Sequence, residues 1–256
     1  MTKRLGKADL HIHSVASDGT ATVGEILRFA EEQTDLDVIA VTDHDRVDAA
    51  LHARELARRR GGRVEVIVGE EVSTRSGHLL ALFVEERIRP WQPLRRSVAE
   101  IHEQGGLAIP AHPLAPYPIC IRRGALLSIV EDADPLLYFD GLETFNPSYA
   151  GRTHHRATAE LNERLHLPAI GNSDAHVTSL IGCAYTTFPG RTTEDLRRAI
   201  LLGRTHAHGQ FLDLPAEVRI YGRQLRKYAR DVRDDLRRAI LGRGSGRDLG
   251  IRKESS

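Results

Sequence analysis

The sequence predicts an α/β fold, a barrel of about seven strands ringed by helices and followed by a helical extension. From residue 8 to about residue 203, short apolar runs alternate with longer stretches of helical period, which is typical of βα units around a parallel sheet. Beyond Gly203 the composition becomes strongly basic. We therefore expect a barrel domain over residues 1–203 and a helical extension over residues 204–256. An open doubly wound sheet is the alternative architecture.

Strands and helices can be placed from local patterns. Thr22-Val23-Gly24-Glu25 is typical of a capping box that opens a helix, and Thr192-Thr193-Glu194 precedes another. The two apolar runs between residues 64 and 84 resemble a hairpin, so we expect the rim of the barrel to be irregular. The apolar runs predict strands at residues 8–13, 37–42, 64–69, 78–84, 107–111, 140–144, 168–171 and 183–188.

The C-terminal extension has its own character. Residues 219–256 hold twelve Arg or Lys against five Asp or Glu. Apolar residues there recur at helical spacing, which predicts an amphipathic helix with an arginine-rich outer face and a frayed end. Packing on the barrel is the favoured role, and binding of a polyanion is the alternative. The apolar positions are Leu225, Tyr228, Val232, Leu236 and Ile240.

Composition excludes several classes of chemistry. Of the 256 residues, 41% are hydrophobic and 28% are charged, and no stretch approaches the roughly 18 apolar residues of a membrane span. With no apolar leader near the start, we expect a cytoplasmic protein without a membrane partner. Two cysteines are too few for a thiolate metal site or a disulfide scaffold. The four lysines, all near the ends, exclude a lysine nucleophile or a phosphate-loop lysine inside the fold: Lys3, Lys7, Lys227 and Lys253.

Histidines and carboxylates gather where the predicted strands end. His11 and His13 lie two residues apart on the first strand, so both imidazoles project from one face. The Ser17-Asp18-Gly19 turn can fold a carboxylate back over the same rim. Other strands end in Thr42-Asp43-His44, Gly69-Glu70-Glu71, Ala111-His112-Pro113 and Ser173-Asp174-Ala175-His176, and His78 precedes another apolar run.

Their joint placement predicts a metal cluster at the carboxyl end of the barrel. Nine ligands are too many for one ion, and three ions with a bridging carboxylate would use them. Nitrogen and oxygen ligands without sulfur suit Mn²⁺, Fe²⁺ or Zn²⁺, so the expected cofactor is two or three divalent ions. Asp43 or Asp45 is the expected partner that orients the imidazoles. The nine candidates are His11, His13, Asp18, His44, Glu71, His78, His112, Asp174 and His176.

The order of these motifs over residues 8 to about 203 resembles that of the PHP (polymerase and histidinol phosphatase) superfamily of metal-dependent phosphoesterases. The resemblance implies a distorted (β/α)7, TIM-like barrel holding two or three divalent metals. It implies that His11, His13 and Asp174 hold one ion, that Glu71 bridges it to a second ion held by His78 and His112, and that Asp18, His44 and His176 hold the third. Glu71, Asp174 and His176 are also the expected catalytic residues. His102 competes with His78 but lies in a predicted helix.

A cluster of this kind suits a phosphate substrate. Three divalent ions, three carboxylates and a hydroxide leave about +2, which matches a dianionic phosphate monoester. Arg122, Arg123 and Arg152 could grip a second phosphate. Tyr117, Phe145 or Tyr149 could stack on a base, although packing is the more frequent role. His206-Ala207-His208 is more consistent with a surface turn than with a further site.

The expected function is hydrolysis of phosphate monoesters, and phosphodiesters are a further class of substrate that the site could accept. Histidinol-phosphate members of the family often have a histidine where this sequence has Asp18, and the aspartate resembles the nucleotide-acting branch. A nucleoside 3′,5′-bisphosphate or the 5′ end of a short single-stranded oligonucleotide is therefore favoured over histidinol phosphate. Hydrolysis of an amide or lactone in an amidohydrolase-like barrel is a second hypothesis, and a non-catalytic PHP scaffold is a third. The sequence leaves the oligomeric state open.

Overall fold

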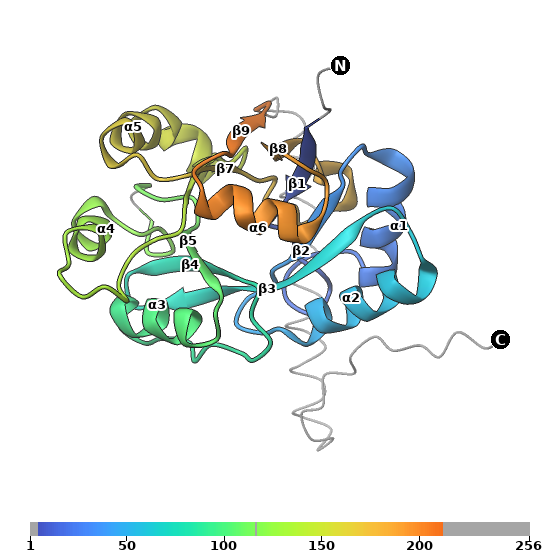
Figure 1. The fold of residues 1–256 in the computed structure, drawn as a ribbon, viewed down its shortest axis with the longest axis horizontal. Coiled ribbons are helices and arrows are strands. Elements are labelled where there is room, and N and C mark those ends of the chain that lie inside the picture. Colours follow the sequence, from blue (N-terminus) through green and yellow to red (C-terminus); the bar gives the residue numbers. More distant parts are fainter. Residues whose placement is uncertain (1–4, 116, 212–256) are drawn as a thin grey trace, which may run out of the picture.

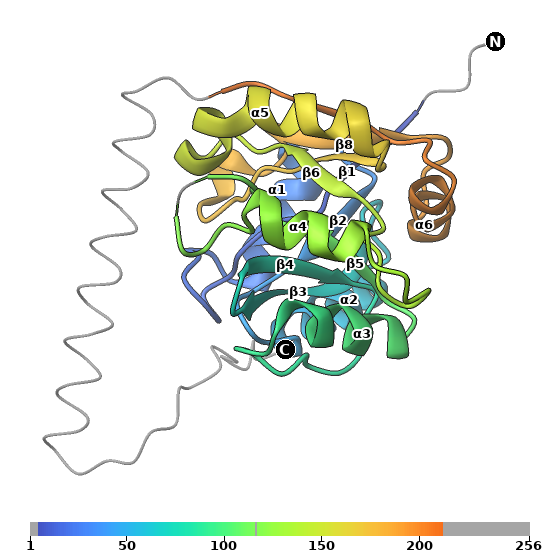
Figure 2. The ribbon, with the colours of Figure 1, turned by 90° about the vertical axis from the view of Figure 1, so that its left-hand side faces the viewer.

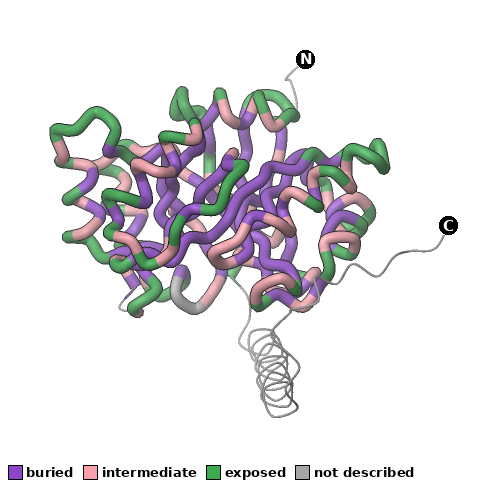
Figure 3. The backbone as a smooth tube through the Cα atoms, turned by 90° about the horizontal axis from the view of Figure 1, so that it is seen from below, coloured by how far each residue is buried: buried purple, intermediate pink, exposed green. Residues whose placement is uncertain are grey.

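Over the described residues, the fold is a curled sheet surrounded by six α-helices. The computed structural model describes residues 5–115 and 117–211. The strands bend around an interior that is almost wholly buried, and the helices form an outer layer around them (Figures 1 and 3). The predicted helix within residues 219–256 lies outside the described residues. In the part of the chain that the structure describes, no helix is long and apolar enough to cross a membrane.

Seven strands form one sheet in the order β5-β4-β3-β2-β1-β8-β9, and β6 pairs with β7 in a second sheet. Backbone N–H of Asp140, just before β6, donates to Ala108 O in β5, and Gly171 N–H in β7 donates to Thr186 Oγ1 in β8. The pair therefore fills the gap between the two ends of the curled sheet. The strands are β1 (Gly6–Asp9), β2 (Val38–Val41), β3 (Glu65–Thr74), β4 (Gly77–Leu82), β5 (Leu107–Pro110), β6 (Leu142–Phe145), β7 (Ala169–Gly171), β8 (Ala184–Phe188) and β9 (His206–Gly209).

The distorted barrel is confirmed, but the expected parallel sheet is only partly correct. Strand β1 pairs in parallel with β2, β2 with β3, and β6 with β7, whereas the other four pairings are antiparallel. The hairpin of β3 and β4 reverses the chain within the barrel wall, as the short gap between their apolar runs predicted. The result is a distorted barrel rather than a regular alternation of parallel strands.

The helices begin where the capping residues predict. Thr22 accepts the backbone N–H of Glu25 and closes a capping box on α1, and Thr192 does the same with Asp195 on α6. Helix α6 crosses the amino end of the barrel, where its Leu196 packs with the interior side chains (Figure 2). The helices are α1 (Val23–Gln33), α2 (Asp48–Arg60), α3 (Leu94–Glu103), α4 (Arg123–Val130), α5 (Tyr149–Leu165) and α6 (Thr193–Leu201), with a short 3-10 turn at Thr178–Leu180.

Strand β9 corrects the expectation of a surface turn at His206-Ala207-His208. It pairs antiparallel with β8, and His208 Nε2 lies 2.9 Å from the hydroxyl oxygen of Thr187. The sheet thus continues past residue 203, where the sequence suggested that the barrel domain ends. A short strand of partly exposed polar residues lacks the apolar run by which the other strands were found.

Candidate metal centre

The nine candidate residues meet at the carboxyl end of the barrel. His11 and His13 follow β1 in an extended segment, and this segment pairs with the loop after β7. His13 N–H donates to Ala175 O at 2.9 Å, and Ala175 N–H donates to His11 O at 3.1 Å. This pairing brings Asp174 and His176, on either side of Ala175, against the two histidines.

Other loops deliver their ligands through unusual backbone conformations. His112 and Asp174 have φ angles of 29° and 53°, in the left-handed region that side chains other than glycine seldom adopt. A Cβ on Gly19 would lie 2.1 Å from His13 O, so the turn carrying Asp18 requires glycine at this position. The fold thus accepts local strain in order to direct these side chains inward.

Glu71 lies at the centre of the cluster, with a different set of imidazoles on each carboxylate oxygen. Its Oε1 is 2.8 Å from His78 Nδ1 and 3.0 Å from His112 Nε2. Its Oε2 is 3.2 Å from His11 Nε2, 3.3 Å from His13 Nε2 and 3.2 Å from His44 Nδ1. Such a carboxylate is placed to bridge two ions.

Asp174 adds a second carboxylate on the side of His11 and His13. Its Oδ1 lies 3.5 Å from His11 Nε2 and 3.4 Å from His13 Nε2. With Glu71 and His112, these three residues are at most 10% exposed in their side chains. We call His11, His13, Glu71, His112 and Asp174 the inner group.

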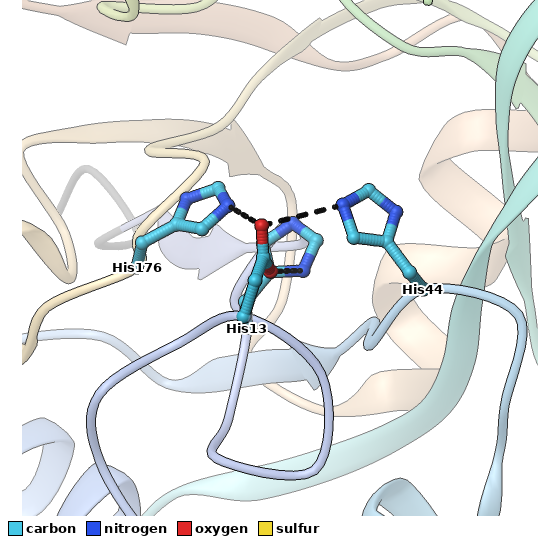
Figure 4. Close-up of side chains that lie close together, drawn as sticks. His13, His44 and His176 are labelled. Carbon is cyan, nitrogen blue, oxygen red and sulfur yellow. Dashed lines mark hydrogen bonds and ion pairs between the residues drawn. The ribbon is translucent and has the colours of Figure 1, made fainter. Parts of the chain in front are cut away.

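Three further candidate ligands, Asp18, His44 and His176, form an outer group, of which Figure 4 shows the two histidines. The ninth candidate, His78, contacts Glu71, and its ring meets those of His44 and His112 edge-on. Asp18 Oδ2 lies 3.1 Å from His176 Nε2 and 3.7 Å from His44 Nε2. The side chains of Asp18, His44 and His176 are 52%, 28% and 16% exposed. The outer group therefore faces the opening of the site.

The donor atoms fit divalent ions. His11 Nε2, His13 Nε2 and His44 Nδ1 are buried and have no hydrogen-bond partner among the described residues. Nitrogen and oxygen atoms that share one ion at bonds of about 2.1 Å lie roughly 3.0 to 3.5 Å apart, as these pairs do. Three groups of ligand atoms are compact enough for an ion: His11 with His13 and Asp174; His13 with Asp18, His44 and His176; and His44 with Glu71 and His78.

The electrostatics of the cluster follow from burial and mutual attraction. Burial alone disfavours ionisation of Glu71 and Asp174, but the imidazoles more than offset it, led by His78 for Glu71 and by His11 for Asp174. The pKa of each carboxyl is therefore held well below its usual value. For His13, burial opposes protonation, yet Asp174 and Glu71 raise its pKa to about 10. Positive charge is thus favoured here, whether from protons or from metal ions.

Glu143 orients the inner group, and sequence analysis missed this role. Its buried carboxylate accepts the Nδ1–H of His11 at 3.0 Å and the backbone N–H of His112 at 2.6 Å. It also accepts the side-chain amides of Asn146 and Asn172. Because His11 donates through Nδ1 to Glu143, its neutral ring would offer the lone pair of Nε2 to a metal ion. The available clue was a carboxylate in a strand that ends at the same rim.

Among the described residues, neither Asp43 nor Asp45 contacts an imidazole directly, although Ser17 Oγ, which donates to Asp43, lies 3.5 Å from His13 Nδ1. Asp43 accepts the backbone N–H of Ser14 and of Ser17, and so folds the loop that carries Asp18. Asp45 accepts the N–H of Ser73 in β3 at 2.7 Å. Both are loop-forming residues, and the carboxylate that holds a histidine comes from a strand distant in the sequence.

Comparison with known families identifies this arrangement. Residues 9–151 match the model of the PHP domain, and residues 152–205 match the model described as PHP-associated. The chain belongs to the PHP domain family. The first match alone covers more than half of the 256 residues. The resemblance inferred from the motif order is therefore confirmed.

The chain is also similar to individual proteins in sequence and in fold. An uncharacterized protein of Methanocaldococcus jannaschii is 34% identical over 151 residues, which cover 55% of this chain and 81% of that protein. A 5′-3′ exoribonuclease of Haemophilus influenzae is 34% identical over 113 residues, 43% of this chain and 39% of the enzyme. In structure, a two-domain protein of Bacteroides vulgatus containing a predicted PHP-like metal-dependent phosphoesterase superposes with a TM-score of 0.64 at 20% identity, covering 86% of this chain and 70% of its own.

Within this PHP fold, the nine predicted ligands lie together, and His102 lies apart. His78 contacts Glu71, whereas His102 is on α3, with its Nε2 3.0 Å from Asp140 Oδ2 and its ring stacked on Tyr138. The groups of ligand atoms differ from the expectation in two respects. His13 joins Asp18, His44 and His176 in the second compact group as well as lying in the first. His44 accompanies Glu71 and His78 in the third compact group, and His112, whose Nδ1 lies 3.3 Å from Cys120 Sγ, stands beside it.

The predicted substrate-binding residues lie outside the cluster. Arg122 and Arg123 are exposed at the start of α4. Arg152 is exposed on α5, with its guanidinium 5.7 Å from the ring centre of Phe211. Phe145 also stacks on the ring of Phe211, at 4.8 Å between centroids, so Phe145 already has an aromatic partner within the protein. None of these residues makes a recorded contact with the nine ligands in the described part of the chain.

Proposed function

We propose that this chain is a metal-dependent phosphoesterase that hydrolyses phosphate esters of a nucleotide. The favoured substrates are a nucleoside 3′,5′-bisphosphate and the 5′ end of a short single-stranded oligonucleotide. The observation that carries the proposal is Glu71, whose two oxygens face two different sets of imidazoles in a buried, ionised cluster. A carboxylate so placed suits two metals that act on one phosphate.

The inner group would hold the more strongly retained ions, and the outer group would hold a further one. His11, His13 and Asp174 form one set around the bridge of Glu71, His78 and His112 form the second, and Asp18, His44 and His176 form the third. Two or three Mn, Fe or Zn ions bound there would supply Lewis acidity and lower the pKa of water toward neutrality.

The protein contributes alignment and charge. Glu143 fixes the ring of His11. With three divalent ions bound, the carboxylates of Asp18, Glu71 and Asp174 together with a hydroxide would leave a net charge of about +2, which matches a phosphate dianion. His176 lies at the exposed edge, with its Nδ1 2.9 Å from the backbone oxygen of Asp174 and its Nε2 3.1 Å from Asp18 Oδ2, so in this proposal its catalytic role is to hold the outer ion near the leaving group. Asp174 and His176 therefore have assigned catalytic roles in this proposal.

The nucleotide preference has two supports. The exoribonuclease of Haemophilus influenzae is 34% identical over 113 residues of this chain. An aspartate at position 18 is also what the resemblance to the PHP superfamily implies for its nucleotide-acting branch. Arg122, Arg123 and Arg152 remain candidates for a second phosphate, because long side chains at the surface can reach a ligand that extends from the rim.

The proposal is tested by purifying the chain without chelator, quantifying Mn, Fe and Zn per chain, and measuring phosphate release. The panel contains adenosine 3′,5′-bisphosphate, mononucleotides, short 5′-phosphorylated RNA and histidinol phosphate. Two or three ions per chain with selective release from the nucleotides are expected. Metal without release from any phosphate ester would favour an amide or lactone substrate, and a chain that binds no metal would overturn the enzyme assignment in favour of a scaffold.

A further inference from the structure

Trp91 is the only tryptophan of the chain, and 66% of it is exposed. Its φ of 59° lies in the left-handed region, which is unfavourable for a bulky side chain. Two hydrogen bonds fix this conformation: Trp91 N–H donates to Ser73 O at 2.6 Å, and Trp91 O accepts from Arg75 Nε at 2.9 Å. A strained backbone that holds a large apolar ring in solvent calls for a functional explanation.

The position of Trp91 places it beside the metal centre. Ser73 lies two residues after Glu71 in β3 and opposite His78 in the ladder with β4. Because adjacent strands lie about 4.8 Å apart, two spacings of roughly 10 Å in all separate the backbone of Trp91 from that of His78. The other backbone group of Ser73, its N–H, is bound by Asp45, the residue after His44. The backbone of Trp91 therefore lies beside the carboxyl-end part of β3 that carries Glu71, next to the loop that follows His44.

Arg75 adds a positive charge at the same place. Its Nε holds the carbonyl of Trp91, and its two terminal nitrogens have no hydrogen-bond partner among the described residues. The side chain is exposed. An aromatic ring next to an arginine suits stacking on a base together with charge neutralisation of the adjoining phosphate.

The other aromatic residues of this rim are less suited to that role. Phe145 and Phe211 stack on each other, His155 meets both rings edge-on, and the Arg152 guanidinium covers Phe211. Their apolar faces are thus used within the protein. The exposed indole of Trp91 has no recorded ring contact in the described part of the chain.

We propose that Trp91 is a stacking platform for the nucleobase of the substrate, and that Arg75 binds a phosphate adjoining that base. This inference rests on the proposed function, because the phosphate at the metal centre and the base on Trp91 belong to one ligand. It assigns a base subsite to the loop beside β3, on a different segment from the arginines of α4 and α5.

The sole tryptophan gives a direct readout on the metal-loaded protein. Adenosine 3′,5′-bisphosphate should quench the intrinsic fluorescence saturably, whereas ribose 5-phosphate and inorganic phosphate should not. Trp91→Ala should raise KM for the nucleotide roughly tenfold or more relative to KM for ribose 5-phosphate. Trp91→Phe should recover most of that loss because it keeps an aromatic face. Tyr138→Ala removes an exposed ring at the opposite end of the barrel and is the matched control.

The outcomes separate this inference from the proposed function. Nucleotide hydrolysis with an unquenched Trp91 and an unchanged KM ratio in Trp91→Ala overturns the platform and leaves the phosphoesterase intact. Absence of phosphate release from every ester overturns the proposed function, and saturable quenching by the nucleotide alone would still support the platform. A change of oligomeric state in Trp91→Ala without quenching in the parent protein would assign the ring to a protein contact and overturn the proposal.

Discussion

The inner and outer groups of the metal centre use the same residue types in different surroundings. His11 and His13 are fully buried and fixed by strand-like pairing, and Glu143 fixes His11 further, whereas Asp18 is 52% exposed on a turn. Buried ligands lose little freedom on binding an ion, because the fold has already ordered them. Exposed ligands must be ordered by the ion and compete with water. We therefore expect the inner group to retain ions that the outer group exchanges.

The largest effect is expected from Glu71→Gln. Loss of the bridging charge should remove at least one ion per chain and reduce activity by more than about 100-fold, since even residues that only orient a ligand are worth about 10- to 100-fold. The measurements are metal content after gel filtration and kcat on a nucleotide. Glu70→Gln is the matched control, because burial raises the pKa of Glu70 to about 8 and an uncharged amide resembles its protonated form. Equal losses in both variants would show that strand β3 has been disrupted.

Glu143→Gln tests whether order in the inner group depends on its orienting carboxylate. The variant keeps the shape but weakens acceptance from His11 and the backbone of His112, so metal affinity should fall about 10- to 100-fold. Competition with a chelator measures the affinity, and surface Glu103→Gln serves as control. An unchanged affinity would mean that pairing of the strand ends alone orders His11.

Asp18→Asn sharpens the comparison from the outer side. We expect one ion per chain to be lost or weakened, with the inner ions retained and a roughly tenfold fall in kcat/KM. The exposed Asp35→Asn, at the ion pair with Lys7, is the control. Metal analysis showing that Asp18→Asn empties the whole cluster would contradict independent retention by the inner group.

The smallest effect concerns stability against pH in the metal-free chain. The pKa of His13 is raised to about 10, so its protonated form stabilises the fold fully below the ordinary histidine pKa, and this contribution is lost as pH rises toward 10. We expect Tm of the chelated protein to fall by at least about 3 °C between pH 7 and pH 9.5. The metal-loaded protein should change less, because its imidazoles are already deprotonated. If Tm falls equally with pH in the metal-free and the metal-loaded protein, protonation of the cluster is excluded as the cause of the fall.

Local patterns determined much of this molecule. The capping boxes at Thr22 and Thr192 and the strand before His44 follow from interactions within a few residues, so the sequence alone located them. The first strand was predicted to include His11 and His13, but it ends at Asp9 and the two histidines follow it. The nine ligand candidates could be named because each follows, belongs to or precedes a strand, or occupies the turn after the first strand, and parallel strands end at one rim. Their assignment to individual ions, and the role of the arginines, stay predictions.

Tertiary structure alone decided the contacts between distant segments. Glu143 meets His11 across 132 positions of sequence, and no local rule distinguishes it from a solvated glutamate. Strand β9 exists because β8 offers it an edge, not because its own residues favour a strand. Trp91, which lies in a turn, is held beside β3 by the hydrogen bond from its N–H to Ser73 O. Periodicity records which face a residue presents to its neighbours along the chain, whereas its partner across the barrel depends on how the whole sheet curls.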